Sequence, residues 1–123
     1  MSSKIEIKRI YEKPSPKDGL RILVDRLWPR GISKENAHID HWQKELAPTG
    51  ALRKWFNHEP EKWEGFKRKY IKELEMNQDL VKEFIDLLKN KPVVTLLYSA
   101  KDEKHNQAVV LHHYLQKLLK EYH

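Results

Sequence analysis

The sequence predicts a small α/β fold in which helices pack on a mostly parallel sheet, and three observations support this prediction. Two apolar segments, 20–28 and 93–100, have the composition of buried strands. Between them, apolar residues recur at intervals of three or four, which is typical of helices, and another such pattern follows residue 105. Strands separated by helices form parallel crossovers. We expect a single domain over residues 1–123, because a chain of this length can bury one core.

The first third of the chain predicts two strands. From Lys4 to Glu12, Ile5 and Ile7 alternate with charged residues, so this segment is expected to have one face in the core. The segment 14–19 contains two prolines and a glycine, which break both helix and sheet. The strand expected at 20–28 is apolar almost throughout, which favours a central position with both faces covered.

The middle of the chain is predicted to be mainly helical. Ile39 to Trp42 could be a short strand or the start of a helix, and Thr49 is a plausible N-cap for a short helix that reaches Phe56. Pro60 occupies a suitable first position for a longer helix. Helical spacing predicts that three aromatic residues of this region belong to the core: Trp55, Trp63 and Tyr70.

The last third predicts a helix, a strand and a final helix. The apolar positions between Leu80 and Leu88 indicate a helix that ends before Asn90 and Pro92. A strand follows at 93–98, and the last helix is expected over 106–120.

The composition limits the possible functions. The chain has no cysteine, which excludes disulfides, thiolate nucleophiles and cysteine-ligated zinc, and favours a reducing compartment. No secretory apolar region or run of about 20 apolar residues is present, so we expect a soluble, cytoplasmic protein without membrane association. Glycine-rich phosphate loops, a Gly-x-Ser-x-Gly elbow and His-Glu-x-x-His are also missing, so neither a cofactor nor a metal is predicted.

The net charge of +6 permits binding to nucleic acid, but bases and acids alternate along residues 61–75, as on a solvated helix face.

Charged residues stand where the strand at 20–28 is expected to end. Alternation would place Asp25 and Leu27 on one face and Arg26 and Trp28 on the other. Buried charges require a partner or a ligand. Asp25 and Arg26 could therefore form an internal network that holds the loop, or Arg26 and Arg30 could bind an anion through two hydrogen bonds each.

The strand expected at 93–100 is also followed by polar residues, and a helix begins soon after them. Tyr98 could donate a proton or only pack, Asp102 could act as a base or cap the helix, and His105 could transfer protons or face water. Ligands bind at the carboxyl ends of parallel strands, where helix N–H groups are free. The two strand ends therefore predict a crevice.

Four motifs follow one another along the chain: Arg-Ile-Leu-Val-Asp-Arg-Leu-Trp-Pro-Arg-Gly from Arg21, Glu-Leu-Ala-Pro-Thr from Glu45, Leu-Arg-Lys-Trp-Phe-Asn-His from Leu52, and Thr-Leu-Leu-Tyr-Ser-Ala-Lys-Asp from Thr95. Together they resemble those of the YeaO-like family of bacterial and archaeal proteins, a domain of unknown function, over nearly the whole chain. The resemblance implies a small α/β domain and adds Arg53 and His58 to the candidate residues. Distant relatives carry cysteines where this chain has Tyr98 and His105 or Asn106, so their thiol chemistry does not carry over.

We expect the crevice to bind or transform a small phosphorylated or carboxylated molecule, because arginines and a helix start stabilise negative charge. If the protein is an enzyme, a hydrolase or transferase is expected, with Tyr98, Asp102 and His105 as the candidate catalytic residues. The candidate ligand-binding residues are Asp25, Arg26, Arg30, Arg53, His58 and Asn106. The alternatives are a nucleic-acid-binding or regulatory module, and a purely internal ion network.

Overall fold

The computed structural model describes residues 4–121 and contains one four-stranded parallel sheet. Its strands are β1 (Lys4–Arg9), β2 (Leu20–Leu23), β3 (His41–Trp42) and β4 (Val93–Tyr98). The strand order is β1-β4-β2-β3, and each neighbouring pair is parallel. The predicted α/β class is confirmed, and β2 and β4 are the two central strands.

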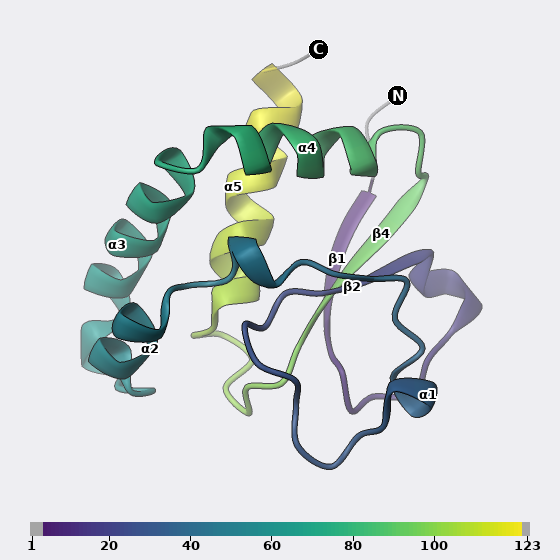
Figure 1. Ribbon diagram of the computed structural model, residues 1–123, viewed down its shortest axis with the longest axis horizontal. Helices are drawn as coiled ribbons and strands as arrows, with labels where there is room; N and C mark the ends of the chain where they lie inside the picture. Colours follow the sequence, from purple (N-terminus) through teal and green to yellow (C-terminus); the bar gives the residue numbers. More distant parts are fainter. Residues whose placement is uncertain (1–3, 122–123) are drawn as a thin grey trace.

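Five α-helices accompany the sheet, and α2 to α5 lie to one side of it while α1 lies to the other (Figure 1). Short 3-10 turns cover Pro16–Asp18, Lys44–Leu46 and Pro60–Lys62. Within residues 4–121, no helix is long and apolar enough to cross a membrane. The helices are α1 (Lys34–Ala37), α2 (Gly50–Phe56), α3 (Trp63–Glu75), α4 (Gln78–Leu88) and α5 (Gln107–Glu121).

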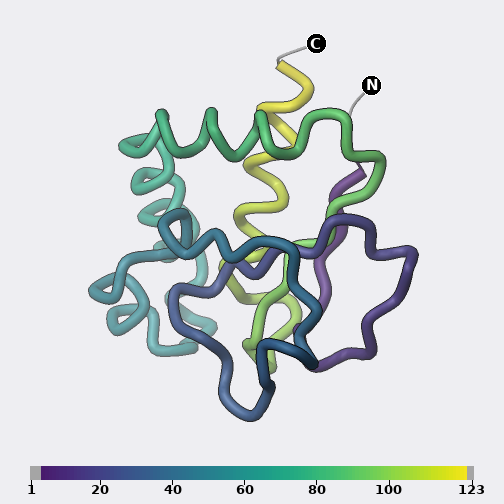
Figure 2. Tube along the Cα trace, turned by 45° about the vertical axis from the view of Figure 1, so that its right-hand side comes forward, coloured from purple at the N-terminus to yellow at the C-terminus, as the bar shows by residue number. Residues whose placement is uncertain are grey.

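The alternation of side chains along the central strands creates two cores. Ile22 and Leu96 point into the larger core, which contains the apolar faces of α2, α3, α4 and α5. Leu23 and Leu97 point the opposite way, into a smaller core with Ala37 of α1. Figure 2 shows the long segment between β2 and α2, which runs out from the sheet and returns to it. Both faces of the central strands are therefore covered, as the continuous apolar pattern predicted.

The strand predicted at 20–28 is only half as long in the structure. It ends at Leu23. The N–H of the next residue, Val24, still donates to Leu97 O at 3.0 Å, and the chain then leaves the hydrogen-bonded ladder. The expected alternation beyond this point is therefore wrong, and Leu27 is 61% exposed. Pro29 and Gly31, the latter with φ +78°, turn the chain instead.

The helical predictions are largely confirmed. Thr49 caps α2 by accepting the N–H of Leu52 at 3.2 Å. Pro60 begins a 3-10 turn, and α3 starts only at Trp63. Trp55 was expected in the core but is 37% exposed, because it lies on the outer side of α2 beneath the ammonium groups of two lysines, Lys62 and Lys69.

Gly19 is required where β2 begins beside β4. Its φ is +64°, a region that only glycine enters without strain. A Cβ atom at this position would lie 2.2 Å from the carbonyl oxygen of Val93. The two central strands can therefore begin side by side only because residue 19 has no side chain.

We expect Gly19→Ala to lower the free energy of unfolding by more than about 2 kcal/mol, through backbone strain and the clash with Val93. Gly50→Ala is the matched control, because Gly50 lies in α2 with nothing within 4 Å of a new Cβ atom. It should stabilise the protein by up to about 1 kcal/mol. Urea unfolding measures both, and equal midpoints for the two variants would contradict the close approach of β2 and β4.

Candidate functional site

A pocket of about 350 Å³ lies where the two central strands end, and we call it the Asp25 pocket. Its walls come from residues 25–26 after β2, from α2 and the residues flanking it, from residues 99–107 after β4, and from Phe66 of α3. Because β2 and β4 are parallel neighbours, the segments that follow them meet at one edge of the sheet. The structure thus places a cavity at the crevice that the sequence predicted.

The carboxylate of Asp25 is buried in the wall of this pocket and accepts hydrogen bonds from two other segments. Ser99 Oγ donates to Oδ2 and Gln107 Nε2 donates to Oδ1, each at 2.5 Å. The side chain therefore links the end of β2 to the loop after β4 and to the first residue of α5.

Burial raises the pKa of Asp25 above its usual value, because a carboxylate loses hydration in this wall. The two hydrogen bonds and the positive charge of Arg53 oppose the increase without cancelling it. Asp25 is 8% exposed, and its partners are neutral donors. The anticipated network between Asp25 and Arg26 is not formed, since Arg26 has other partners.

Arginines hold two of the loops that surround the pocket. Arg26 lines the pocket, but its Nε donates to Pro48 O at 2.9 Å and its Nη2 to Ala47 O at 2.8 Å. Arg9 of β1 donates in the same way to the carbonyls of Ala100 and Ser99, at 2.9 and 3.1 Å. Both guanidinium groups therefore fix backbone next to the pocket, and Arg26 still faces the cavity.

Two further cations, Arg53 and Lys54 of α2, line the pocket and are exposed. Within residues 4–121, neither side chain makes a hydrogen bond or an ion pair. Arg53 still acts on Asp25 through its charge. These two side chains are free to contact a ligand at no cost in existing bonds.

His105 also lines the pocket and is oriented by two neighbours. Its Nδ1 donates to Asp102 Oδ2 at 2.8 Å, and its ring packs edge-on against Trp63 with centroids 5.2 Å apart. This hydrogen bond holds the pKa of Asp102 below its usual value. Asp102 itself is exposed and does not line the pocket. The pair leaves Nε2 of His105 free to donate to, or accept from, a bound molecule.

His58 lies at the exposed end of α2 and also lines the pocket. It follows Asn57, and both residues have positive φ, 46° and 55°. Two successive left-handed residues other than glycine are uncommon and turn the chain sharply. The ring of His58 lies 6.4 Å from that of Phe56, which forms part of the apolar wall with Phe66.

The remaining candidates have different positions. Asn106 lines the pocket and caps α5, accepting the N–H of Val109 at 3.1 Å. Tyr98 points into the larger core, where burial first, and then Glu103 and Glu12, raise the pKa of its hydroxyl. Arg30 is exposed on the loop after β2 and does not line the pocket.

Sequence reasoning missed three residues of the site: Lys54, Ser99 and Gln107. Lys54 looked like one of many surface lysines, although it follows Arg53 directly. Ser99 and Gln107 could have been found from their positions, because Ser99 directly follows β4 and Gln107 is the first residue of α5. In the described part of the chain, His, Asp and Glu form no group of three that could hold a metal ion.

Comparisons with known proteins place the chain among relatives without an assigned activity. The family model described as the inactive DUF488-N3 subclade matches residues 4–123. The uncharacterized protein YeaO of Escherichia coli is 44% identical over 114 residues, which cover 93% of this chain and 98% of that protein. The uncharacterized proteins Rv3073c of Mycobacterium tuberculosis and Mb3100c of Mycobacterium bovis are each 35% identical over 109 residues, 89% of this chain and 91% of theirs. No solved structure matches. The chain therefore belongs to the YeaO-like DUF488 family.

Proposed function

We propose that this protein binds a small phosphorylated or carboxylated molecule in the Asp25 pocket. The observation that carries the proposal is the pair Arg53 and Lys54, two cations that line the cavity and whose side chains make no hydrogen bond or ion pair in the described part of the chain. Guanidinium groups bind carboxylates and phosphates through paired hydrogen bonds, and an ammonium group adds a point charge.

The charge of the lining supports an anionic ligand. Arg26, Arg53 and Lys54 are positive and Asp25 is the one acidic side chain, so the formal charge of the lining is +2. The 15-residue helix α5 begins at the pocket with Gln107, and its dipole adds positive potential there.

The family description favours binding over turnover. The subclade whose model matches is described as inactive. The hydrogen bond between Asp102 and His105 fixes the imidazole ring, which suits a ligand contact through Nε2 as well as proton transfer. A hydrolase or transferase would need the same anion site. We therefore propose ligand binding, rather than catalysis, as the function.

The alternative, a nucleic-acid-binding module, has less support. Lysines of the α3 region have acidic partners, Lys62 with Glu59 at 3.0 Å and Lys67 with Glu64 at 2.9 Å. Such pairs compensate the positive charge of this surface. Nucleic-acid binding would weaken steeply with salt and would depend on many lysines rather than on one pocket.

A thermal-shift screen with inorganic phosphate, phosphate monoesters and small carboxylates tests the proposal, and isothermal titration calorimetry measures the affinity of the best ligand. Arg53→Gln should lower that affinity by at least about tenfold, because a charged hydrogen-bond donor is lost from the site. The fold should not change, since Arg53 makes no bond within the described residues.

Arg68→Gln and Arg30→Gln are matched controls, because both arginines are exposed and neither lines the pocket. Both should bind the ligand as the wild type does. Equal losses in all three variants would point to diffuse charge attraction, and the absence of any stabilising ligand would remove the small-anion proposal.

Asp25→Asn should strengthen anion binding, because it removes the acidic group from the lining while the amide can still bond with Ser99 and Gln107. It should also change the pH dependence of stability. In the wild type the folded-state pKa is raised, so stability declines as pH increases from about 4, the unfolded value, through the folded pKa.

The variant does not titrate at this position. Its melting temperature relative to the wild type should therefore rise across that pH range and level off above the folded pKa. A constant difference between the two proteins from pH 3 to 8 would show that Asp25 is not perturbed as described; calorimetry measures the effect.

A further inference from the structure

Asp18 and Asp25 are the two carboxylates that the protein buries within residues 4–121, with exposed fractions of 7% and 8%. Asp18 has two counter-ions: Lys8 Nζ lies 3.1 Å from its Oδ1, and Arg21 Nη1 forms an ion pair with its Oδ2. Asp25 forms no ion pair with any described residue, and the side chains that donate to it are neutral. The chain therefore supplies counter-ions for one buried carboxylate and not for the other.

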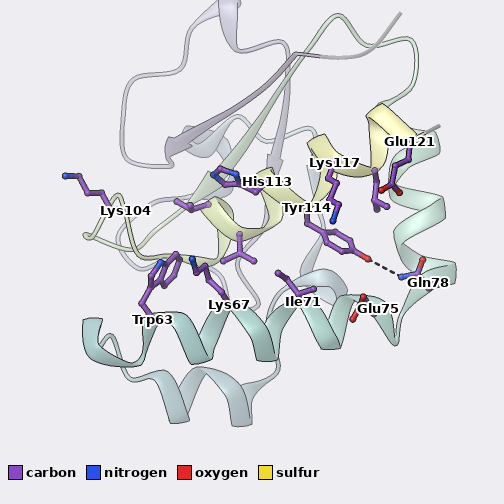
Figure 3. Close-up of a pocket in the computed structure, with 13 residues that line it drawn as sticks. Trp63, Lys67, Ile71, Glu75, Gln78, Lys104, His113, Tyr114, Lys117 and Glu121 are labelled. Atoms are coloured by element: carbon purple, nitrogen blue, oxygen red, sulfur yellow. Dashed lines mark hydrogen bonds between the residues drawn. The ribbon is translucent and has the colours of Figure 1, made fainter. Parts of the chain in front are cut away.

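The acidic residues of a larger cavity also differ from Asp25. That cavity, of about 910 Å³, lies between α3 and α5 and shares no lining residue with the Asp25 pocket (Figure 3). Its carboxylates, those of Glu75 and Glu121, are exposed, so water compensates their charge. Asp25 lines a cavity without such compensation from water.

A buried carboxylate without a counter-ion costs free energy, because neutral hydrogen bonds do not fully replace the hydration of a negative charge. A carboxylate can accept about four hydrogen bonds. Ser99 contributes its hydroxyl and its backbone N–H, and Gln107 its side-chain amide. Capacity therefore remains for a further donor, and because Asp25 lines the pocket, a cationic group bound there could provide it.

We propose that the ligand of the Asp25 pocket carries a protonated amine as well as its phosphate or carboxylate group, and that Asp25 binds this amine. The inference rests on the proposed function, in which Arg53 and Lys54 bind the anionic group. The ligand is then a zwitterion of the chemical class of amino acids and aminoalkyl phosphates. A cavity of about 350 Å³ is near the lower limit for ligand sites, which suits a compact molecule.

The charge of the lining makes the effect of an amine informative. Because the lining has a formal charge of +2, an ammonium group on an anion should by itself weaken binding. It can strengthen binding only where it lies next to Asp25, the one acidic side chain of the lining. The sign of the effect therefore separates a specific contact from general attraction.

Pairs of phosphonates that differ only in the amine test the inference. Isothermal titration calorimetry compares 2-aminoethylphosphonate with ethylphosphonate, and 3-aminopropylphosphonate with propylphosphonate. We expect the amine to raise the affinity by at least about tenfold in at least one pair, because a charge-assisted hydrogen bond to a buried carboxylate is gained. A hydroxyl group in place of the amine, as in 2-hydroxyethylphosphonate, should raise the affinity much less.

Asp25→Asn should remove the advantage of the amine. The aminated compounds should bind this variant less tightly than the wild type, while the two alkylphosphonates should bind it equally or more tightly. Glu103→Gln is the matched control, because Glu103 is an exposed acid in the loop after β4 and does not line the pocket. It should keep the preference of the wild type. Circular dichroism checks folding. If Asp25→Asn does not fold, Gln107→Lys replaces it, since an ammonium group beside Asp25 should also remove the preference.

The possible outcomes separate this inference from the proposed function. If the alkylphosphonates bind the wild type and the amine improves neither pair, the inference is wrong and the anion site stands. An advantage of the amine that persists in Asp25→Asn also contradicts the inference, because the amine then binds elsewhere. If no compound of either kind binds, the proposed function itself fails, and this inference fails with it.

Discussion

The buried carboxylate of Asp25 organises the carboxyl edge of the sheet. It accepts hydrogen bonds from Ser99 after β4 and from Gln107 at the start of α5, while the backbone carbonyl of the same residue accepts the indole N–H of Trp42 in β3 at 2.7 Å. One residue thus joins the ends of three strands and a helix. Because an unpaired carboxylate is costly to bury, these donors must be in place for the edge to form. The pocket exists where they converge.

Around this point the basic residues divide into two groups. Arg9 and Arg26 use their guanidinium groups to hold backbone carbonyls, so their charge serves the shape of the loops. The side chains of Arg53 and Lys54 make no hydrogen bond to a backbone carbonyl within the described residues, and both line the cavity. The separation between cations that build the site and cations that remain free is the physical basis for assigning an anionic ligand.

Sequence patterns that reflect burial predicted the fold. The predictions that were wrong concern features that local contacts determine. Continuous apolar composition predicted that β2 is central and that β4 is buried. It did not predict that β2 ends at Leu23, where the chain leaves the ladder after the hydrogen bond of Val24. Helical spacing placed Tyr70 correctly in the core and Trp55 wrongly, since an aromatic side chain that lies half exposed beneath lysine ammonium groups has the same spacing. The crevice could be located from strand ends. The orientation of Arg26, the position of Arg30 outside the pocket and the roles of Ser99 and Gln107 could not, because they depend on tertiary hydrogen bonds.

An amide-resolved NMR titration with inorganic phosphate tests the central claim, that the Asp25 pocket is the site at which this protein binds anions. We expect saturable shifts concentrated at the amides of Arg53, Ala100 and Gln107, together with the side-chain amide of Gln107, which bonds to Asp25. Small, non-saturating shifts spread over the lysine-bearing surfaces of α3 and α4 would contradict the claim, because they would mean that positive charge, and not this pocket, attracts the anion.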